Sequence, residues 1–247
     1  MFPQFPKSLR AGGQECPTNN LGDIQKMPKK KGSALLMVWA DVPAHKEDDF
    51  NGWYNEEHLA ERLACPGFLS GARYEVVTTG PKHLAMYELE SLAALQTPEY
   101  RKVREEPSEW TKRASPDVIG TTFIRNTYEM FLPDKLSDEM ADRGMANALQ
   151  IGRINIKPED EAGWNDWYDN IYIPNYEKVP GVISGRRFLA AEGEPKYLTV
   201  YDFEHENVSK SAEWDHQRTI NPANEHWQKT MLHLPDSPGI WRKTFEL

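Results

Sequence analysis

The feature that most constrains the fold of this 247-residue chain is an internal repeat. Residues 34–90 align with residues 148–204 at a constant offset of 114, without a gap, and 16 of the 57 positions are identical. Ordinary composition gives roughly one chance match in fifteen. The identical pairs include aromatic, turn-forming and basic residues: Trp53/Trp167, Tyr54/Tyr168, Pro66/Pro180, Gly67/Gly181 and Arg73/Arg187. The sequence therefore predicts a duplication, and two such units usually pack against each other.

The pattern within each repeat predicts an α+β unit. Strands are expected over residues 34–42, 68–77, 82–90 and 120–131, with a helix over 48–63 and an interrupted helical region over 92–113. This β-α-β-β-α-β order is the ferredoxin-like arrangement, and it recurs from residue 148. We therefore expect an N-terminal arm over residues 1–32, one ferredoxin-like unit over 33–131, a linker over 132–145 and a second unit over 146–247.

The first strand is apolar on both of its alternating faces. Leu35, Met37 and Trp39 point to one side, and Leu36 and Val38 point to the other. A sheet with helices on one side must cover its second face as well. The sequence therefore predicts that the two units pack as an intramolecular α/β barrel, with a cavity between the two facing sheets.

The composition indicates where the protein is located in the cell and which kinds of partner it does not bind. The chain has only two cysteines, no apolar run of about 20 residues and no secretory signal, so we expect a cytoplasmic protein that does not use a membrane. The net charge is −9, and residues 1–31 carry six basic and two acidic side chains. The remainder is therefore strongly acidic, which disfavours nucleic acid as a partner.

The repeat differs most where chemistry is expected. In the helix, His58 stands opposite Tyr172 and Glu57 opposite Ile171. Tyr54 and His58 are four residues apart and share a helix face, so an imidazole and a phenol can act on one substrate. The alternatives are a structural histidine, a solvated Glu57 carboxylate and core packing for the paired tryptophans and tyrosines.

The run Trp53-Tyr54-Asn55-Glu56-Glu57-His58, followed by Pro66-Gly67, resembles the dimeric α/β-barrel superfamily, and its EthD-like members most. The second copy departs from this pattern, with Tyr172 at the histidine position. The superfamily includes cofactor-free cyclases, isomerases, lyases and monooxygenases as well as haem-binding proteins. The resemblance therefore implies the fold more strongly than the reaction.

From these observations we predict a cofactor-independent lyase, isomerase or cyclase that transfers a proton on a small apolar or aromatic carbonyl compound, in a homodimeric protein. The alternatives are a non-catalytic small-molecule-binding protein and a haem-binding protein, with His216, His226 or His233 as the axial ligand. No metal site is expected, because the histidines form no H-x-x-x-H or His/Cys cluster. The predicted catalytic residues are His58, Tyr54 and Glu57, and the predicted substrate-binding residues are Trp53, Arg73, Tyr168, Asp169 and Tyr172.

Overall fold

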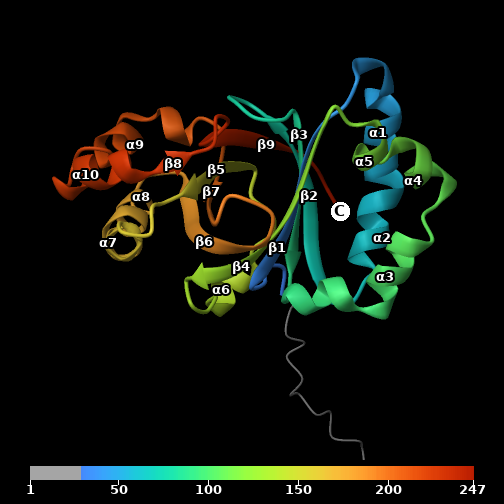
Figure 1. The fold of residues 1–247 in the computed structure, drawn as a ribbon, viewed down its shortest axis with the longest axis horizontal. Coiled ribbons are helices and arrows are strands. Elements are labelled where there is room, and N and C mark those ends of the chain that lie inside the picture. The colour runs from blue at the N-terminus through green and yellow to red at the C-terminus, as the bar shows by residue number, and fades with distance from the viewer. Residues whose placement is uncertain (1–28) are drawn as a thin grey trace, which may run out of the picture.

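A closed antiparallel barrel forms the centre of the protein, and helices cover it on two opposite sides (Figure 1). The computed structural model describes residues 29–247, so residues 1–28 of the predicted arm lie outside the described residues. The strand order is β7-β6-β4-β1-β3-β2-β9-β5, and pairing of β5 with β7 closes the ring. A short ninth strand, β8, pairs with the end of β5. The predicted α+β barrel is confirmed.

The first unit has the predicted order of strands and helices. Its elements are β1 (Ala34–Asp41), η1 (Ala44–Lys46), α1 (Glu47–Trp53), η2 (Tyr54–His58), α2 (Leu59–Leu63), β2 (Phe68–Val76), β3 (His83–Leu89), η3 (Leu92–Gln96), α3 (Pro98–Glu105), α4 (Glu109–Ala114), α5 (Pro116–Ile119) and β4 (Thr122–Leu132). A short helix, α6 (Asp138–Asp142), lies in the connection to the second unit.

The second unit repeats this order. Its elements are β5 (Ala148–Asn155), α7 (Glu161–Trp167), η4 (Tyr168–Tyr172), α8 (Ile173–Tyr176), β6 (Val182–Glu192), β7 (Tyr197–Phe203), η5 (Val208–Lys210), α9 (Ala212–Gln217), α10 (Ala223–Thr230), β8 (Leu232–His233) and β9 (Gly239–Glu246). In the part of the chain that is described, no helix is both long and apolar enough to cross a bilayer.

Local sequence signals explain where the helices of the first unit begin. The hydroxyl of Thr97 accepts a hydrogen bond from the backbone N–H of Tyr100, and Pro98 occupies the first turn of α3. Ser108 caps α4 in the same way through the N–H of Thr111. Gly67 ends the first helical region with a φ of 83°. A Cβ there would lie 2.7 Å from the Cβ of Ala94, so this turn requires glycine.

The interior of the barrel is a packed core. Leu35, Met37 and Trp39 of β1 point into it and meet large side chains of the other unit, such as Phe188 and Trp241, all of them 0% exposed. Leu36 of the same strand points outward, toward the helices of the first unit. The predicted alternation of faces is therefore confirmed. The predicted cavity between the two sheets is wrong, because apolar side chains from both sheets fill that space.

Two ladders join the units and close the barrel. Strand β2 of the first unit pairs with β9, the last strand of the second, and β4 pairs with β6. Each unit therefore completes the sheet of the other, and no edge of either four-stranded sheet faces solvent along its whole length.

Four charged side chains form a buried cluster inside one end of the barrel. The Lys31 ammonium lies 2.9 Å from Asp202 and 3.4 Å from Glu88. Arg186 donates two hydrogen bonds to Glu88, of 2.6 and 3.0 Å. All four side chains are at most 1% exposed. Two positive and two negative charges are thus removed from water together, and Lys31, which precedes β1, fixes the start of the described chain to both units.

Candidate functional site

The helix that packs against the first unit's sheet contains a π-helical segment. This segment, η2, covers Tyr54–His58 between α1 and α2, and η4 covers the equivalent Tyr168–Tyr172 in the second unit. Segments of this kind occur mostly as single turns inside α-helices, often at functional sites, because they alter the direction of the side chains that follow. In the first unit this segment carries His58.

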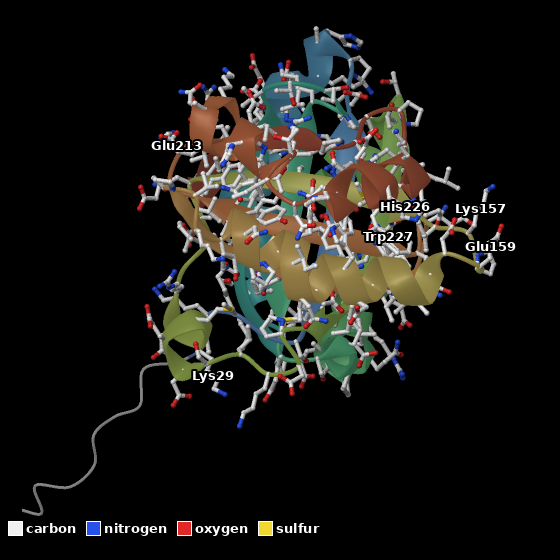
Figure 2. The ribbon with its side chains drawn as sticks, turned by 90° about the vertical axis from the view of Figure 1, so that its left-hand side faces the viewer. Lys29, Lys157, Glu159, Glu213, His226 and Trp227 are labelled. Atoms are coloured by element: carbon white, nitrogen blue, oxygen red, sulfur yellow. The ribbon has the colours of Figure 1, made fainter. Side chains whose placement is uncertain are left out.

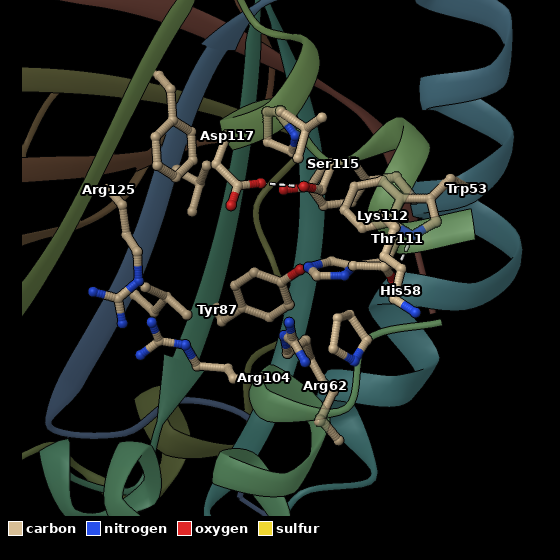
Figure 3. Close-up of a pocket in the computed structure, with 18 of the residues that line it drawn as sticks. Trp53, His58, Arg62, Tyr87, Arg104, Thr111, Lys112, Ser115, Asp117 and Arg125 are labelled. Carbon is tan, nitrogen blue, oxygen red and sulfur yellow. Dashed lines mark hydrogen bonds between the residues drawn. The ribbon is translucent and has the colours of Figure 1, made fainter. Parts of the chain in front are cut away.

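A pocket of about 410 Å³ lies between this helix and the outer face of the first unit's sheet. It is open to solvent and falls in the size range of small-molecule sites, roughly 300–1,000 Å³. Figure 3 shows His58 and Thr111 on one side, Arg104 and Arg125 on the other, and Tyr87 between them. Strands β1, β3 and β4 form its floor, and α3, α4 and α5 close it from above.

His58 is the central polar group of this pocket. Its ring centroid lies 4.2 Å from that of Trp53 and 5.0 Å from that of Tyr54. Its Nδ1 atom is buried and has no hydrogen-bond partner among the described residues. Burial, followed by the charges of Arg62 and Arg73, lowers the pKa of His58 well below 6.5. The imidazole is therefore neutral at pH 7, with a lone pair available for a proton or a metal ion.

Two phenols accompany the imidazole. Burial raises the pKa of Tyr54 to about 12, although Arg73 and Arg62 oppose this shift. Burial also raises the pKa of Tyr87 well above 10. The Tyr87 hydroxyl is buried and, among the described residues, has no hydrogen-bond partner. Both phenols therefore stay protonated at neutral pH, and Tyr87 has an O–H to donate to a bound molecule.

The charges around the pocket are mostly positive. Arg62, Arg104, Lys112 and Arg125 line it, together with one carboxylate, Asp117. Arg125 is partly balanced from outside the pocket by an ion pair of 2.7 Å with a glutamate of β6. The pocket therefore favours a ligand that carries negative charge on an apolar or aromatic body.

Glu57, a predicted catalytic residue, does not line this pocket. Its carboxylate accepts hydrogen bonds from the hydroxyls of Ser108, at 2.5 Å, and Thr111, at 3.3 Å. Thr111 in turn accepts a 3.0 Å hydrogen bond from the indole N–H of Trp53. Glu57 therefore fastens the start of α4 to the His58 helix, and it contacts the pocket only through Thr111.

The duplicated arginines hold equivalent positions beside the helices. Arg73 donates to the side-chain oxygens of Asn55 and Asn51, at 3.0 and 2.7 Å. Arg187 pairs with Asp169, which stands at the position of Asn55 in the repeat. Arg73 does not line the pocket that contains His58, and neither Arg73 nor Asp169 lines the smaller pocket beside Tyr168. Their predicted role in substrate binding therefore has no support in this geometry.

The remaining predicted residues lie in a second, smaller pocket. Tyr168 and Tyr172 line a space of about 170 Å³ between the sheet and the helices of the second unit. His216, His226 and His233 are all exposed, and of these three His233 lines this pocket. Figure 2 places His226 on the outer surface of α10. The structure thus brings Trp53, Tyr54 and His58 together and leaves the second-unit residues in a separate site.

Several lining residues of the larger pocket had no sequence signal. Arg104 and Lys112 come from the proline-interrupted region, where no periodicity indicates which side faces inward. Tyr87 is identical to Tyr201 in the repeat, and identity between the two copies does not distinguish a site residue from a packing residue. The position of Tyr87 opposite Leu36 in the β1–β3 ladder places its ring on the helix side of the sheet.

Comparison with known proteins identifies the fold. Neither a protein-family model nor a curated protein sequence matches this chain. Three solved structures are similar over nearly their whole length. They are an anthrone oxidase-like protein (10% identity, TM-score 0.58, 89% of this chain and 94% of that chain), a putative chlorite dismutase (10%, 0.53, 87% and 96%) and a haem-binding protein from Thermus thermophilus (11%, 0.52, 87% and 92%). At such identities, the likeness is one of fold.

These neighbours correct the predicted reaction class. None of the three is named as a lyase, an isomerase or a cyclase, and one is named for haem binding. The prediction of a cofactor-independent lyase, isomerase or cyclase is therefore wrong, and the haem-binding alternative agrees better with them. The predicted location of the substrate site, in a cavity between the two sheets, is wrong as well, because the larger pocket lies between the sheet and the helices of the first unit.

Proposed function

We propose that the larger pocket, in the first unit, binds haem. One observation carries this proposal: a neutral, partly buried imidazole, whose buried Nδ1 atom has no partner among the described residues, shares a 410 Å³ pocket with four basic side chains. The named haem-binding neighbour with this fold supports the choice of ligand.

The residues present fit this group. Haem is a planar aromatic ring system with two carboxylates, and its iron accepts an imidazole as axial ligand. Aromatic and apolar side chains such as Tyr100 and Val103 suit the ring, and Arg104 and Arg125 suit the carboxylates. Among the described residues, no group of three or more His, Cys, Asp or Glu side chains is placed to hold a bare metal ion. A single histidine is sufficient for haem.

In this proposal His58, and not one of the C-terminal histidines, would hold the haem iron through its imidazole. Its lowered pKa keeps the imidazole deprotonated, as coordination requires. Tyr87 offers a protonated hydroxyl to a molecule beside the ring, and Trp53 limits the rotation of His58. When bound, haem supplies redox chemistry that the side chains do not have. We propose that the protein is an enzyme of this oxidative class, and a non-catalytic haem carrier is the alternative.

The test is a haemin titration of the metal-free full-length protein, followed by its Soret absorption. Wild type should shift and sharpen the band at a ratio of one to one. His58→Ala should lose the histidine-dependent Soret shift and weaken binding at least tenfold, whereas His233→Ala, which alters the other pocket, should match wild type. No Soret shift in the wild type, or equal spectra for His58→Ala and wild type, would overturn the proposal.

Two other expectations stay predictions. Membership of the EthD-like group rests on the Tyr54–His58 pattern and the Pro66-Gly67 turn alone. A homodimer is expected as before, and sedimentation of the full-length chain measures it directly.

A further inference from the structure

The smaller pocket, in the second unit, has the size of one aromatic ring. It occupies about 170 Å³ between β5, β7 and the helices of that unit. An apolar protein cavity of roughly 150 Å³ is known to bind benzene. The larger pocket has more than twice this volume, so the two sites suit ligands of different size.

Its walls are aromatic. Tyr168, Tyr172, Tyr176, Tyr201 and Trp214 line it, and the Tyr176 and Trp214 ring centroids lie 4.2 Å apart. Aromatic walls of this kind favour an aromatic ligand, because rings attract one another in offset-stacked or edge-to-face contacts.

Three polar atoms of residues that line this pocket lack hydrogen-bond partners within residues 29–247: Gln150 Oε1, Thr199 Oγ1 and the Tyr201 hydroxyl. All three atoms are buried. Tyr201 is 4% exposed. Gln150 and Tyr201 stand directly opposite each other in the β5–β7 ladder, so their side chains are neighbours on the same face. An unpaired polar atom in such a place costs free energy, and a ligand that pairs with both atoms recovers it.

The first unit has no such pair. Leu36 occupies the position of Gln150 and faces Tyr87 in the β1–β3 ladder. The amide oxygen is therefore particular to the smaller pocket, and it requires a ligand with a hydrogen-bond donor.

Charge excludes an ionic ligand from the interior of this pocket. Among the residues that the structure describes, no carboxylate lines it. Its one permanent cation, Arg218, is 56% exposed and lies 3.5 Å from Asp215. His233 is exposed at the surface, but partial desolvation of its imidazole lowers the pKa below 6.5, so it is neutral at pH 7. An ion would lose its hydration without finding a buried partner of opposite charge.

We propose that the smaller pocket binds a neutral single-ring phenol. The phenol O–H donates to Gln150 Oε1, its oxygen accepts from the Tyr201 hydroxyl, and its ring packs among the tyrosines. This site is separate from the proposed haem pocket and does not depend on it.

The experiment is isothermal titration of the full-length protein with phenol, and with benzene and benzoate for comparison. Wild type should bind phenol more tightly than either. Gln150→Leu, which installs the residue of the first unit, and Tyr201→Phe should each raise the Kd for phenol about three- to tenfold. Tyr87→Phe is the matched control, because it removes the equivalent hydroxyl from the larger pocket, and it should leave the Kd unchanged.

Both test variants remove an unpaired buried atom, so they should fold with an unchanged or higher Tm. The proposal is overturned by a wild type that does not bind phenol, or by benzene or benzoate binding equally well. It is also overturned if Gln150→Leu and Tyr201→Phe keep the wild-type Kd. A Tyr87→Phe effect as large as that of Tyr201→Phe would place phenol in the larger pocket and reject the site as well.

Discussion

Loss of the Lys31 charge should destabilise the protein far more than loss of a surface lysine. Lys31 and Arg186 balance Glu88 and Asp202, and none of the four side chains is more than 1% exposed. Lys31→Met leaves one buried negative charge without compensation. Breaking a buried pair in this way costs about 3–5 kcal/mol. The free energy of unfolding should fall by that amount, and Lys30→Met, at an exposed neighbouring position, should change it by less than about 0.5 kcal/mol.

The double variant Lys31→Met/Asp202→Asn tests the reasoning behind that magnitude. It removes one positive and one negative charge, so the cluster stays neutral, and Arg186 and Glu88 keep their two hydrogen bonds. Asp202→Asn alone should also be costly, since it leaves one positive charge in excess. The double variant should therefore be more stable than the sum of the single costs implies, by at least about 2 kcal/mol.

Urea unfolding at pH 7, followed by tryptophan fluorescence and far-UV circular dichroism, measures the free energy of unfolding of wild type and of the four variants. Additive costs within about 0.5 kcal/mol would refute the charge-balance argument, and so would a Lys31→Met cost below about 1 kcal/mol. A large cost for Lys30→Met would indicate a general effect of the segment before β1 instead.

Three further outcomes are expected. The pKa of His58 in the folded protein is below 6.5, so the stability that the neutral imidazole contributes is complete above pH 6.5 and is lost as the pH falls toward the folded pKa. The urea midpoint should therefore decrease more between pH 7.5 and pH 5.5 in wild type than in His58→Phe. Equal decreases would contradict this. Asp169→Asn removes the carboxylate partner of the buried Arg187 but restores the amide that the first unit uses, so calorimetry should show a cost of about 1–2 kcal/mol, and a cost above about 4 would show that the amide cannot substitute. Gly67→Ala forces a side chain into a φ of 83° and toward Ala94, so chemical denaturation should show a loss of about 1–3 kcal/mol, and no loss would mean that the turn relaxes.

The fold could be predicted from the sequence because the patterns that indicate it are local or periodic. The alternation of Leu35, Leu36 and Met37 assigns two buried faces to β1, and the Gly67 turn and the repeat offset place the following strands. Alternation does not reveal how tightly two facing sheets pack. Trp39 and Trp241 help to fill the space where a cavity was expected, and their place in one core depends on a register that no local pattern specifies.

The candidate site was only partly predictable for a related reason. Trp53, Tyr54 and His58 share one helical segment, so their spacing alone places them together. Arg104 and Arg125 reach the same pocket from α3 and β4. Thr97 and Pro98 determine where α3 begins, but the direction in which the helix runs over the sheet is set by packing, which the sequence does not show. The pairing of Lys31 with Asp202 joins residues 171 positions apart in the chain, which spacing cannot indicate.

The pairing of β2 with β9 determines when the barrel can close during synthesis of the chain. The edge of β2 (Phe68–Val76) emerges from the ribosome well before the strand that covers it, β9 (Gly239–Glu246). Until β9 has been made, this edge and the apolar inner face behind it lack their cover. An uncovered strand edge can pair with another chain, so the barrel is exposed to aggregation until β9 is added.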